Sequence, residues 1–168
     1  PITNGMSRRL IVLLAALALA AGLGTATARA ASTPWYPLYQ AINNVRRAHG
    51  LRLVVPSPRL HWAARHHSDD MLVHHYFAHT SPWGSTLYSR ILGSGFLTYG
   101  YWQAGETLAW GTGFDATPAG VVQMWMHSPE HRAILLSPLF RFVGIGRAQG
   151  RFLGHAGAAV WTADWGHR

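Results

Sequence analysis

The segment Ser128-Pro129-Glu130-His131-Arg132 sets a histidine just after a Ser-Pro pair, and two segments of similar design precede it in the chain. They are Ala78-His79-Thr80-Ser81-Pro82 and Gly105-Glu106. A loop can hold a His or Glu toward a shared cleft only if its backbone is constrained, and neighbouring Gly, Pro and Ser supply this constraint. We therefore expect His79, Glu106 and His131 to converge in the folded chain.

Apolar periodicity and capping residues predict helices in the front part of the chain. The expected helices cover about residues 38–48, 57–76, 86–92 and 117–126. On the first of them, Leu38 and Ile42 lie on the apolar face, whereas Asn43 and Arg46 lie elsewhere. On the second, His67 falls on the inward stripe, where a histidine is most often a hydrogen-bonded core residue.

The end of the chain changes to the spacing of strands. Alternating apolar residues predict strands over 142–148 and 154–165, with Gly150 in the turn. Residues 96–113, between the helices, are rich in Gly and aromatic residues, and we assign them no element. Helices followed by strands favour a single α/β domain with α-β-α layers.

The first 30 residues are typical of an export signal. Arg8 and Arg9 precede an uncharged run over residues 10–24, and Ala28-Arg29-Ala30 is a small-x-small cleavage pattern. A run of about 15 residues is shorter than the roughly 20 that span a membrane. We expect upstream residues and a signal peptide over 1–30, with cleavage after Ala30. The two arginines leave open whether export follows the Sec or the twin-arginine route. The only expected membrane contact is through the uncleaved signal segment.

In the rest of the chain we expect a short flexible entry over 31–37 and one domain over 38–168. Loss of the three arginines in the signal lowers the formal net charge from +8 to +5. The remaining arginines are scattered, which suits an anionic envelope polymer or lipid headgroups and argues against nucleic acid. Because the chain has no Cys, its core alone must stabilise it.

A series of motifs, spread over about residues 38–166, resembles the bacterial branch of the CAP superfamily, which includes cysteine-rich secretory proteins, antigen 5 and plant pathogenesis-related proteins. In chain order the motifs are Asn43-x-x-Arg46-x-x-x-Gly50-Leu51, His67-Ser68-Asp69-Asp70-Met71, Phe77-Ala78-His79-Thr80-Ser81-Pro82-x-Gly84, Arg90, Gly105-Glu106, Trp125-Met126-x-Ser128-Pro129-x-His131-Arg132, Pro138-x-Phe140 and Val143-Gly144-Ile145-Gly146. The resemblance implies an exported, three-layer α-β-α sandwich. It also implies a central cleft lined by two His and two acidic residues, of which this chain matches His79, Glu106 and His131.

The sequence departs from the family pattern at the second acidic residue. Many animal and plant members carry a Glu where this chain has Ser128. Glu130 stands next to His131 and either replaces the missing carboxylate or lies on the surface, where an unpaired Glu is more common. Further departures fall at Thr107, Trp83 and Ile134.

Three roles are open for the convergent residues. The side chains of His79, Glu106 and His131 can hydrogen-bond one another and tie three loops together, or they can line a binding cleft. In that cleft His79 and His131 are candidate ligands for a divalent metal such as zinc, since neutral imidazoles bind it. The third role is catalysis by His79, Glu106 and His131, with Glu106 or a His as the base that activates a water. Ser81 and Ser128 are candidate nucleophiles, although a Ser before Pro is more often a turn or cap residue.

These features lead to two hypotheses about function. The first is an exported domain, secreted or periplasmic, whose cleft binds a small ligand, lipid or divalent metal at the envelope or outside the cell. The alternative is a hydrolase that acts on envelope material or peptide through the same cleft. A set of aromatic residues can line a groove for lipid or glycan. It comprises Trp83, Phe96, Tyr99, Tyr101, Trp102 and Trp110. The sequence leaves the oligomeric state open.

Overall fold

The structure is a computed structural model that describes residues 33–96 and 100–168. The predicted signal peptide, its cleavage after Ala30 and the aromatic Tyr99 lie outside these residues. The chain divides into two compact units, Pro1–Tyr36 and Pro37–Arg168. In the first unit, the structure describes residues 33–36, where the Tyr36 amide donates to the Thr33 carbonyl. The second unit is the folded domain.

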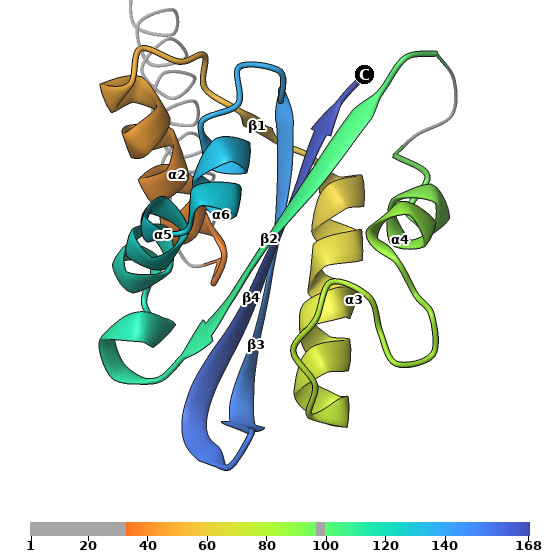
Figure 1. Cartoon of the computed structure of the whole chain (residues 1–168), viewed down its shortest axis with the longest axis vertical. Helices are drawn as coiled ribbons and strands as arrows, with labels where there is room; N and C mark the ends of the chain where they lie inside the picture. Colours follow the sequence, from red (N-terminus) through yellow and green to blue (C-terminus); the bar gives the residue numbers. More distant parts are fainter. Residues whose placement is uncertain (1–32, 97–99) are drawn as a thin grey trace, which may run out of the picture. The chain divides into compact units, whose positions relative to one another are not determined.

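The domain contains helices and strands, whose positions Figure 1 shows. The elements are α2 (Tyr36–Ala48), β1 (Val55–Pro56), α3 (Pro58–His74), α4 (Leu87–Gly93), β2 (Gln103–Gly111), the 3-10 helix η1 (Gly113–Ala116), α5 (Pro118–His127), α6 (Pro129–Leu135), β3 (Phe142–Phe152) and β4 (His155–His167). No helix in the described ranges has the length and apolar character that crossing a membrane requires.

Four strands form one sheet in the order β1-β3-β4-β2. The β3–β4 hairpin pairs antiparallel, β1 pairs parallel with β3, and β2 pairs antiparallel with β4. In the last of these pairs Glu106 lies directly opposite Asp164. Since directly paired residues project from the same face of a sheet, these two acidic side chains are neighbours.

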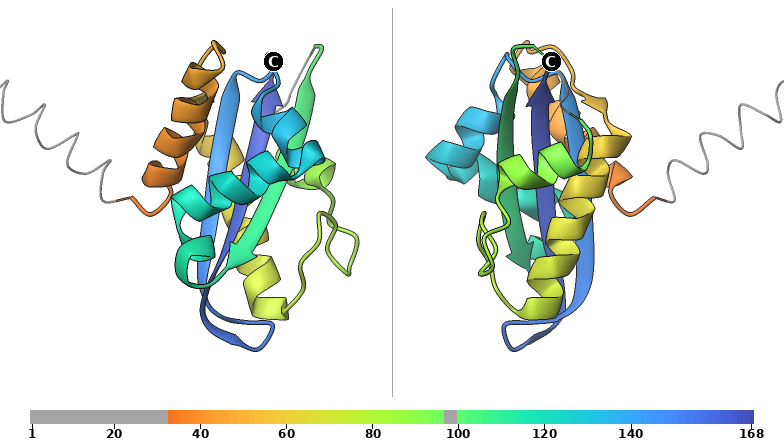
Figure 2. Two further views of the ribbon diagram at one scale, coloured as in Figure 1. Left: turned by 60° about the vertical axis from the view of Figure 1, so that its left-hand side comes forward. Right: turned by 90° about the vertical axis from the view of Figure 1, so that its right-hand side faces the viewer.

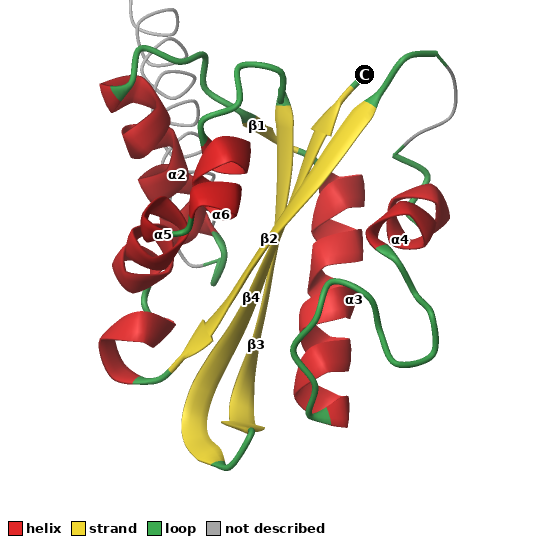
Figure 3. Ribbon diagram, viewed as in Figure 1, coloured by secondary structure: helices red, strands yellow, loops and turns green. Residues whose placement is uncertain are grey.

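The sheet lies between two helical layers, as Figures 2 and 3 show, so the predicted three-layer α-β-α fold is confirmed. Helices α3 and α4 lie on one side, and α2, α5 and α6 on the other (Figure 1). Helix α3 packs tightly on β3 because Gly144 and Gly146 carry no side chain there. A Cβ atom at Gly146 would overlap the backbone of Ala64 in α3.

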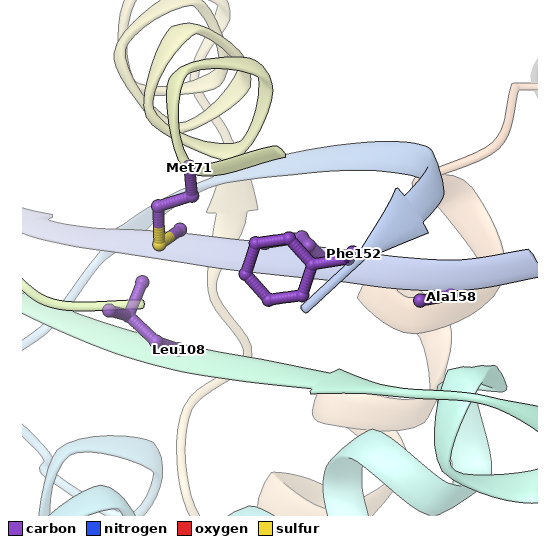
Figure 4. Packing of buried hydrophobic residues seen from close by; sticks show 5 residues of the cluster. Met71, Leu108, Phe152 and Ala158 are labelled. Atoms are coloured by element: carbon purple, nitrogen blue, oxygen red, sulfur yellow. The ribbon is translucent and has the colours of Figure 1, made fainter. Parts of the chain in front are cut away.

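Apolar side chains fill the space between α3 and the sheet. Figure 4 shows Met71 of α3 directed toward Leu108 and Phe152, which lie on β2 and β3. The opposite face of β4 buries Trp161 and Trp165, and each indole N–H has an acceptor. Large buried rings with satisfied polar atoms explain how a chain without cysteine can form a stable core.

All predicted helices and strands are present, whereas β1, β2, η1 and α6 were not predicted. The four predicted helices correspond to α2, α3, α4 and α5, and the two predicted strands to β3 and β4. Strand β2 was missed because it is buried on both faces and therefore lacks the alternation of a half-buried strand. Helix α6 has seven residues and follows α5 directly, and its Ser128-Pro129 start was assigned only to a constrained loop.

The expectation that Asn43 and Arg46 lie away from the buried side of the first helix was wrong. Both are buried, and both bind backbone atoms of later segments. The Asn43 amide pairs with the backbone of Val54, and the Arg46 guanidinium donates to the carbonyls of Leu135 and Ser137. Burial, and next the charge of Arg141, lower the pKa of Arg46. These polar contacts fasten α2 to the residue just before β1 and to the C-terminal end of α6.

Candidate functional site

The structure brings His79, Glu106 and His131 together at the β2 side of the sheet. His79 lies in the loop between α3 and α4, Glu106 on β2, and His131 in the first turn of α6. The His79 Nδ1 atom lies 2.7 Å from Glu106 Oε1, and the ring centroids of His79 and His131 are 6.2 Å apart. A loop, a strand and a short helix therefore each contribute one side chain.

Glu106 is a buried carboxylate whose two oxygens both accept hydrogen bonds. Its side chain is 1% exposed. While Oε1 accepts from His79, Oε2 accepts from the Arg90 guanidinium at 2.7 Å, and His67 Nε2 lies 3.9 Å from Oε2. Burial by itself raises the pKa of Glu106, but the hydrogen bond from His79 and the charge of Arg90 outweigh it and leave this pKa below its usual value.

Arg90 of α4 joins the site to the loop that carries His79. Besides binding Glu106, its guanidinium donates to the backbone carbonyls of His79 and Ser85, each at 3.0 Å. One buried cation therefore holds strand β2, helix α4 and both ends of the His79 turn. We noted Arg90 in the motif series but gave it no place in the site; its contacts depend on how α4 docks, which local sequence does not specify.

Asp164 is a second buried acid, for which the sequence analysis led to no expectation. It lies opposite Glu106 on β4 and is fully buried. Burial, and next the charge of Glu106, raise the pKa of Asp164 well above its usual range. Asp164 therefore retains its proton, and the acid pair carries one negative charge, which Arg90 balances. The sequence signal that could have identified Asp164 is its position as an acidic residue inside the apolar run of the last strand.

His131 lies beside His79 but makes no hydrogen bond to Glu106 in the described structure. Burial, and next the charge of His79, lower the pKa of His131, which favours its neutral form. Its neighbour Glu130 is exposed on α6, in line with the surface alternative and not with a replacement for the absent cleft carboxylate.

The two serines near the histidines hold backbone turns. Ser81 is buried, and its Oγ accepts from the Ser85 amide at 2.8 Å within the His79 loop. Ser128 is the N-cap of α6, where its Oγ accepts from the His131 amide. Neither hydroxyl has a hydrogen bond to an imidazole in the parts of the chain that the structure describes, so neither has the base that an activated serine needs.

The remaining candidates separate into core and surface. Among residues 33–96 and 100–168, no group of three or more His, Asp and Glu side chains has the arrangement of a metal site. His67 is buried, as predicted, and its Nε2 lies 3.0 Å from the Ala78 carbonyl. Of the predicted aromatic groove residues, Phe96 is buried, Trp110 packs on the core, and Tyr101 is exposed.

A groove of about 520 Å³ opens beside His79 and Glu106. Its polar lining consists of these two side chains with Thr80 and Thr86. The rest of the lining is apolar or aromatic: Leu87, Tyr88, Trp102, Ala104 and Ile134. The Tyr88 and Trp102 rings stack with centroids 5.5 Å apart. An apolar lining with a few polar groups is typical of small-molecule sites. We call this hollow the β2 groove.

Comparison with known proteins agrees with the fold and the motifs. The sequence model of the cysteine-rich secretory protein family, CAP, matches residues 39–164. The chain is 31% identical over 123 residues to the uncharacterised protein YkwD of Bacillus subtilis (strain 168). The aligned region spans 73% of this chain and 43% of YkwD. The matched region is thus less than half of that relative's length.

Two solved structures share the architecture. An extracellular protein with an SCP domain from Bacillus anthracis (strain Ames) superposes with a TM-score of 0.64 at 26% identity, over 78% of this chain and 39% of that chain. An outer surface protein of Borrelia burgdorferi also gives a TM-score of 0.64, at 21% identity, over 78% and 90% of the two chains. The family match, the fold and the ordered motifs lead to one conclusion: the chain belongs to the cysteine-rich secretory protein (CAP) family.

Proposed function

We propose that this domain is an exported binding protein that takes a small amphipathic molecule of lipid type into the β2 groove. The observation that carries the proposal is the mixed lining of the groove. Leu87, Trp102 and Ile134 supply apolar surface, whereas His79 supplies a polar group. An aliphatic chain would lie against the apolar wall, and its headgroup would meet the imidazole.

The hydrogen bonding of His79 supports this arrangement. Its side chain is 56% exposed, and Glu106 occupies its Nδ1 atom, which leaves Nε2 for a ligand. A carboxylate that orients one ring nitrogen directs the other toward the ligand. In contrast, both oxygens of Glu106 are already bound, and the nearby serines hold turns. These contacts favour binding over the alternative of hydrolysis.

Action at the envelope or outside the cell is part of the same proposal. The signal-like residues 1–30 support it, and so does the description of the B. anthracis relative as an extracellular protein. A moderate positive charge suits a site near anionic envelope polymers or headgroups.

Titration of decanoate into the purified domain tests the binding proposal. We expect Trp102→Ala to weaken binding at least about tenfold, since a buried aromatic contact at an interface contributes on the order of 1–2 kcal/mol. Trp62→Ala is the matched control, because Trp62 is also a partly exposed Trp but does not line the β2 groove. Absence of decanoate binding, or equal weakening by both substitutions, would contradict the proposal.

A further inference from the structure

The two ends of the sheet differ in the side chains that surround them. The Val55–Phe142 and Gln103–His167 pairs bring the starts of β1, β2 and β3 together with the end of β4. This end of the sheet lies at the top of Figure 1, opposite the β3–β4 hairpin. We call the surface around it the basic end, which comprises Arg52, Leu53, Arg59, Tyr101, Leu139 and Arg141.

Three arginines give the basic end its charge. Arg52 lies before β1, Arg141 directly precedes β3, and Arg59 is in the first turn of α3. The side chains of Arg52 and Arg59 are exposed, and that of Arg141 is partly exposed. Backbone carbonyls position two of the guanidinium groups, since Arg59 donates to Gly95, and Arg141 donates to Pro138 at 3.0 Å. Each guanidinium has further N–H groups, which suit the oxygens of a phosphate.

The acidic side chains of the protein lie away from the basic end. The chain has six of them, all within the described residues: two are buried in the middle of the sheet, two lie in the second half of α3, one lies in η1 and one at the start of α6. In that order they are Glu106, Asp164, Asp69, Asp70, Asp115 and Glu130.

Packing contacts fix the direction of the elements that carry these acids. Helix α3 runs from the basic end toward the hairpin, because its residue Leu72 lies 3.4 Å from the position of a Cβ atom at Gly150. Helix η1 packs on Gly111, the last residue of β2. The end of α6, and not its start, leads into β3. The arginines of the basic end therefore have no acidic side chain beside them in the described structure.

Exposed apolar side chains lie among these arginines. Tyr101 is 73% exposed, Leu139 51% and Leu53 38%. Leu53 follows Arg52 in the chain, and Leu139 lies two residues before Arg141. Single exposed apolar residues are common on protein surfaces, but apolar and basic side chains together are typical of surfaces that bind anionic membranes. There, apolar side chains enter the boundary between headgroups and acyl chains, a Tyr lies at the level of the headgroups, and arginines bind phosphates.

We propose that the basic end docks the domain on a lipid bilayer that contains anionic phospholipids. The apolar residues favour a bilayer over a dissolved anionic polymer, because a polymer would pair with the arginines and leave Tyr101 and Leu139 in water. Arginines that are scattered in the sequence are thus gathered by the fold, and membrane contact extends beyond the signal segment that the sequence analysis predicted. The residues of the basic end do not line the β2 groove, so either proposal can fail without the other.

Sedimentation with large unilamellar vesicles tests the proposal. The domain is used without residues 1–30, because the apolar run over 10–24 would itself bind lipid, and Pro37–Arg168 is a compact unit of its own. We expect binding to vesicles of phosphatidylglycerol and phosphatidylcholine in equal parts, and weak binding to phosphatidylcholine alone. Raising NaCl to about 0.5 M should release the domain, since salt screens the charges.

Substitutions at the basic end should weaken this binding. Arg52→Gln combined with Arg141→Gln should weaken it about 25-fold, because each arginine near an anionic membrane surface contributes about fivefold. Leu139→Ser and Tyr101→Ser should each weaken it at least about threefold, since each removes apolar area from the contact.

Matched variants elsewhere separate docking from net charge. Arg65→Gln combined with Arg151→Gln removes the same two charges from exposed positions on α3 and β3. Leu153→Ser removes an apolar residue, 44% exposed, from the turn between β3 and β4 at the other end of the sheet. Both controls should bind vesicles as the wild type does, and every variant should keep the wild-type circular dichroism spectrum.

The proposal is overturned if the anionic vesicles do not bind, if phosphatidylcholine vesicles bind equally well, or if the controls weaken binding as much as the substitutions at the basic end. Weaker binding by the arginine variant, with Leu139→Ser and Tyr101→Ser unchanged, would assign the surface to a dissolved polyanion and also overturn it. Decanoate binding by Leu139→Ser, expected at wild-type strength, distinguishes this test from that of the β2 groove.

Discussion

At the scale of single residues, the centre of the site is an acid pair that shares one negative charge. Glu106 is ionised, Asp164 is protonated, and Arg90 balances the pair. Because two carboxylates side by side cannot both ionise at low cost, the proton stays on the more deeply buried acid. This arrangement makes Glu106 a residue that holds loops together as well as one that faces a cleft.

Replacement of Glu106 by Gln tests how much of its role is structural. The amide preserves the shape but leaves the buried Arg90 cation without its partner, and breaking a buried ion pair from one side costs about 3–5 kcal/mol. We expect a loss of that order in the free energy of unfolding by urea at pH 7. Glu130→Gln, on the exposed part of α6, is the matched control and should change stability little. A loss below about 1 kcal/mol would instead assign Glu106 chiefly to a ligand.

The raised pKa of Asp164 predicts a specific dependence of stability on pH. Its stabilising contribution is present below the unfolded-state pKa of about 3.9 and is lost as the pH rises through the higher folded-state pKa. Asn cannot ionise, so Asp164→Asn should unfold like the wild type near pH 4 and be more stable at pH 8. The difference should grow by about 1.4 kcal/mol for each pH unit between the two pKa values.

Urea unfolding from pH 4 to pH 9 measures this difference, and Asp115→Asn at an exposed position provides the control. The pH dependence that Glu106 contributes has the opposite sign, since its contribution to stability is lost as the pH falls through its lowered folded-state pKa. Stability curves of wild type and Asp164→Asn that run parallel across this range would show that Asp164 is ionised in the fold.

At the scale of elements, capping residues were good predictors of where helices begin. Ser57 and Thr117 each precede a Pro, and each accepts a hydrogen bond at the start of α3 or α5. The same pair at Ser128-Pro129 begins α6, which we did not predict, although the signature was present. Strand β2 had no equivalent local signal, because burial on both faces removes the alternation that identifies a strand.

The contact between α3 and β3 leads to a test of packing. Gly146→Ala would place a methyl group on the backbone of Ala64, which cannot move aside without shifting α3. We expect a loss of about 1–3 kcal/mol or more, as for other overpacked cores. Gly150→Ala on the same strand is the matched control, because its methyl group would lie 3.4 Å from the Leu72 side chain in ordinary contact. Thermal unfolding of both variants measures the contrast, and equal melting temperatures would show that α3 is not held against β3 at Gly146.

At the scale of the whole molecule, the fold was predictable from motifs in order, and the site only in part. His79 could be anticipated because its loop is constrained by neighbouring Ser and Pro. Glu106 was also anticipated, but the expectation that a loop holds it was wrong, since it lies on strand β2. Arg90 and Asp164 could not be placed in the site, since their roles depend on the docking of α4 and on the β2–β4 register. Local sequence patterns do not specify such long-range geometry. His131 lies beside His79, although its ring bonds neither Glu106 nor His79 among the described residues, and its participation in the site stays a prediction.

The position of β2 at the end of the strand order also bears on self-association. A strand with one unpaired edge can template pairing with another chain, and natural proteins cover such edges. Here the Glu106–Arg90 pair fastens α4 and the His79 loop to β2, and α6 also contacts this strand. The residues that shape the groove thus also cover the edge of the sheet at β2. A variant that releases them would first show itself as aggregation, before the core between α3 and the sheet unfolds.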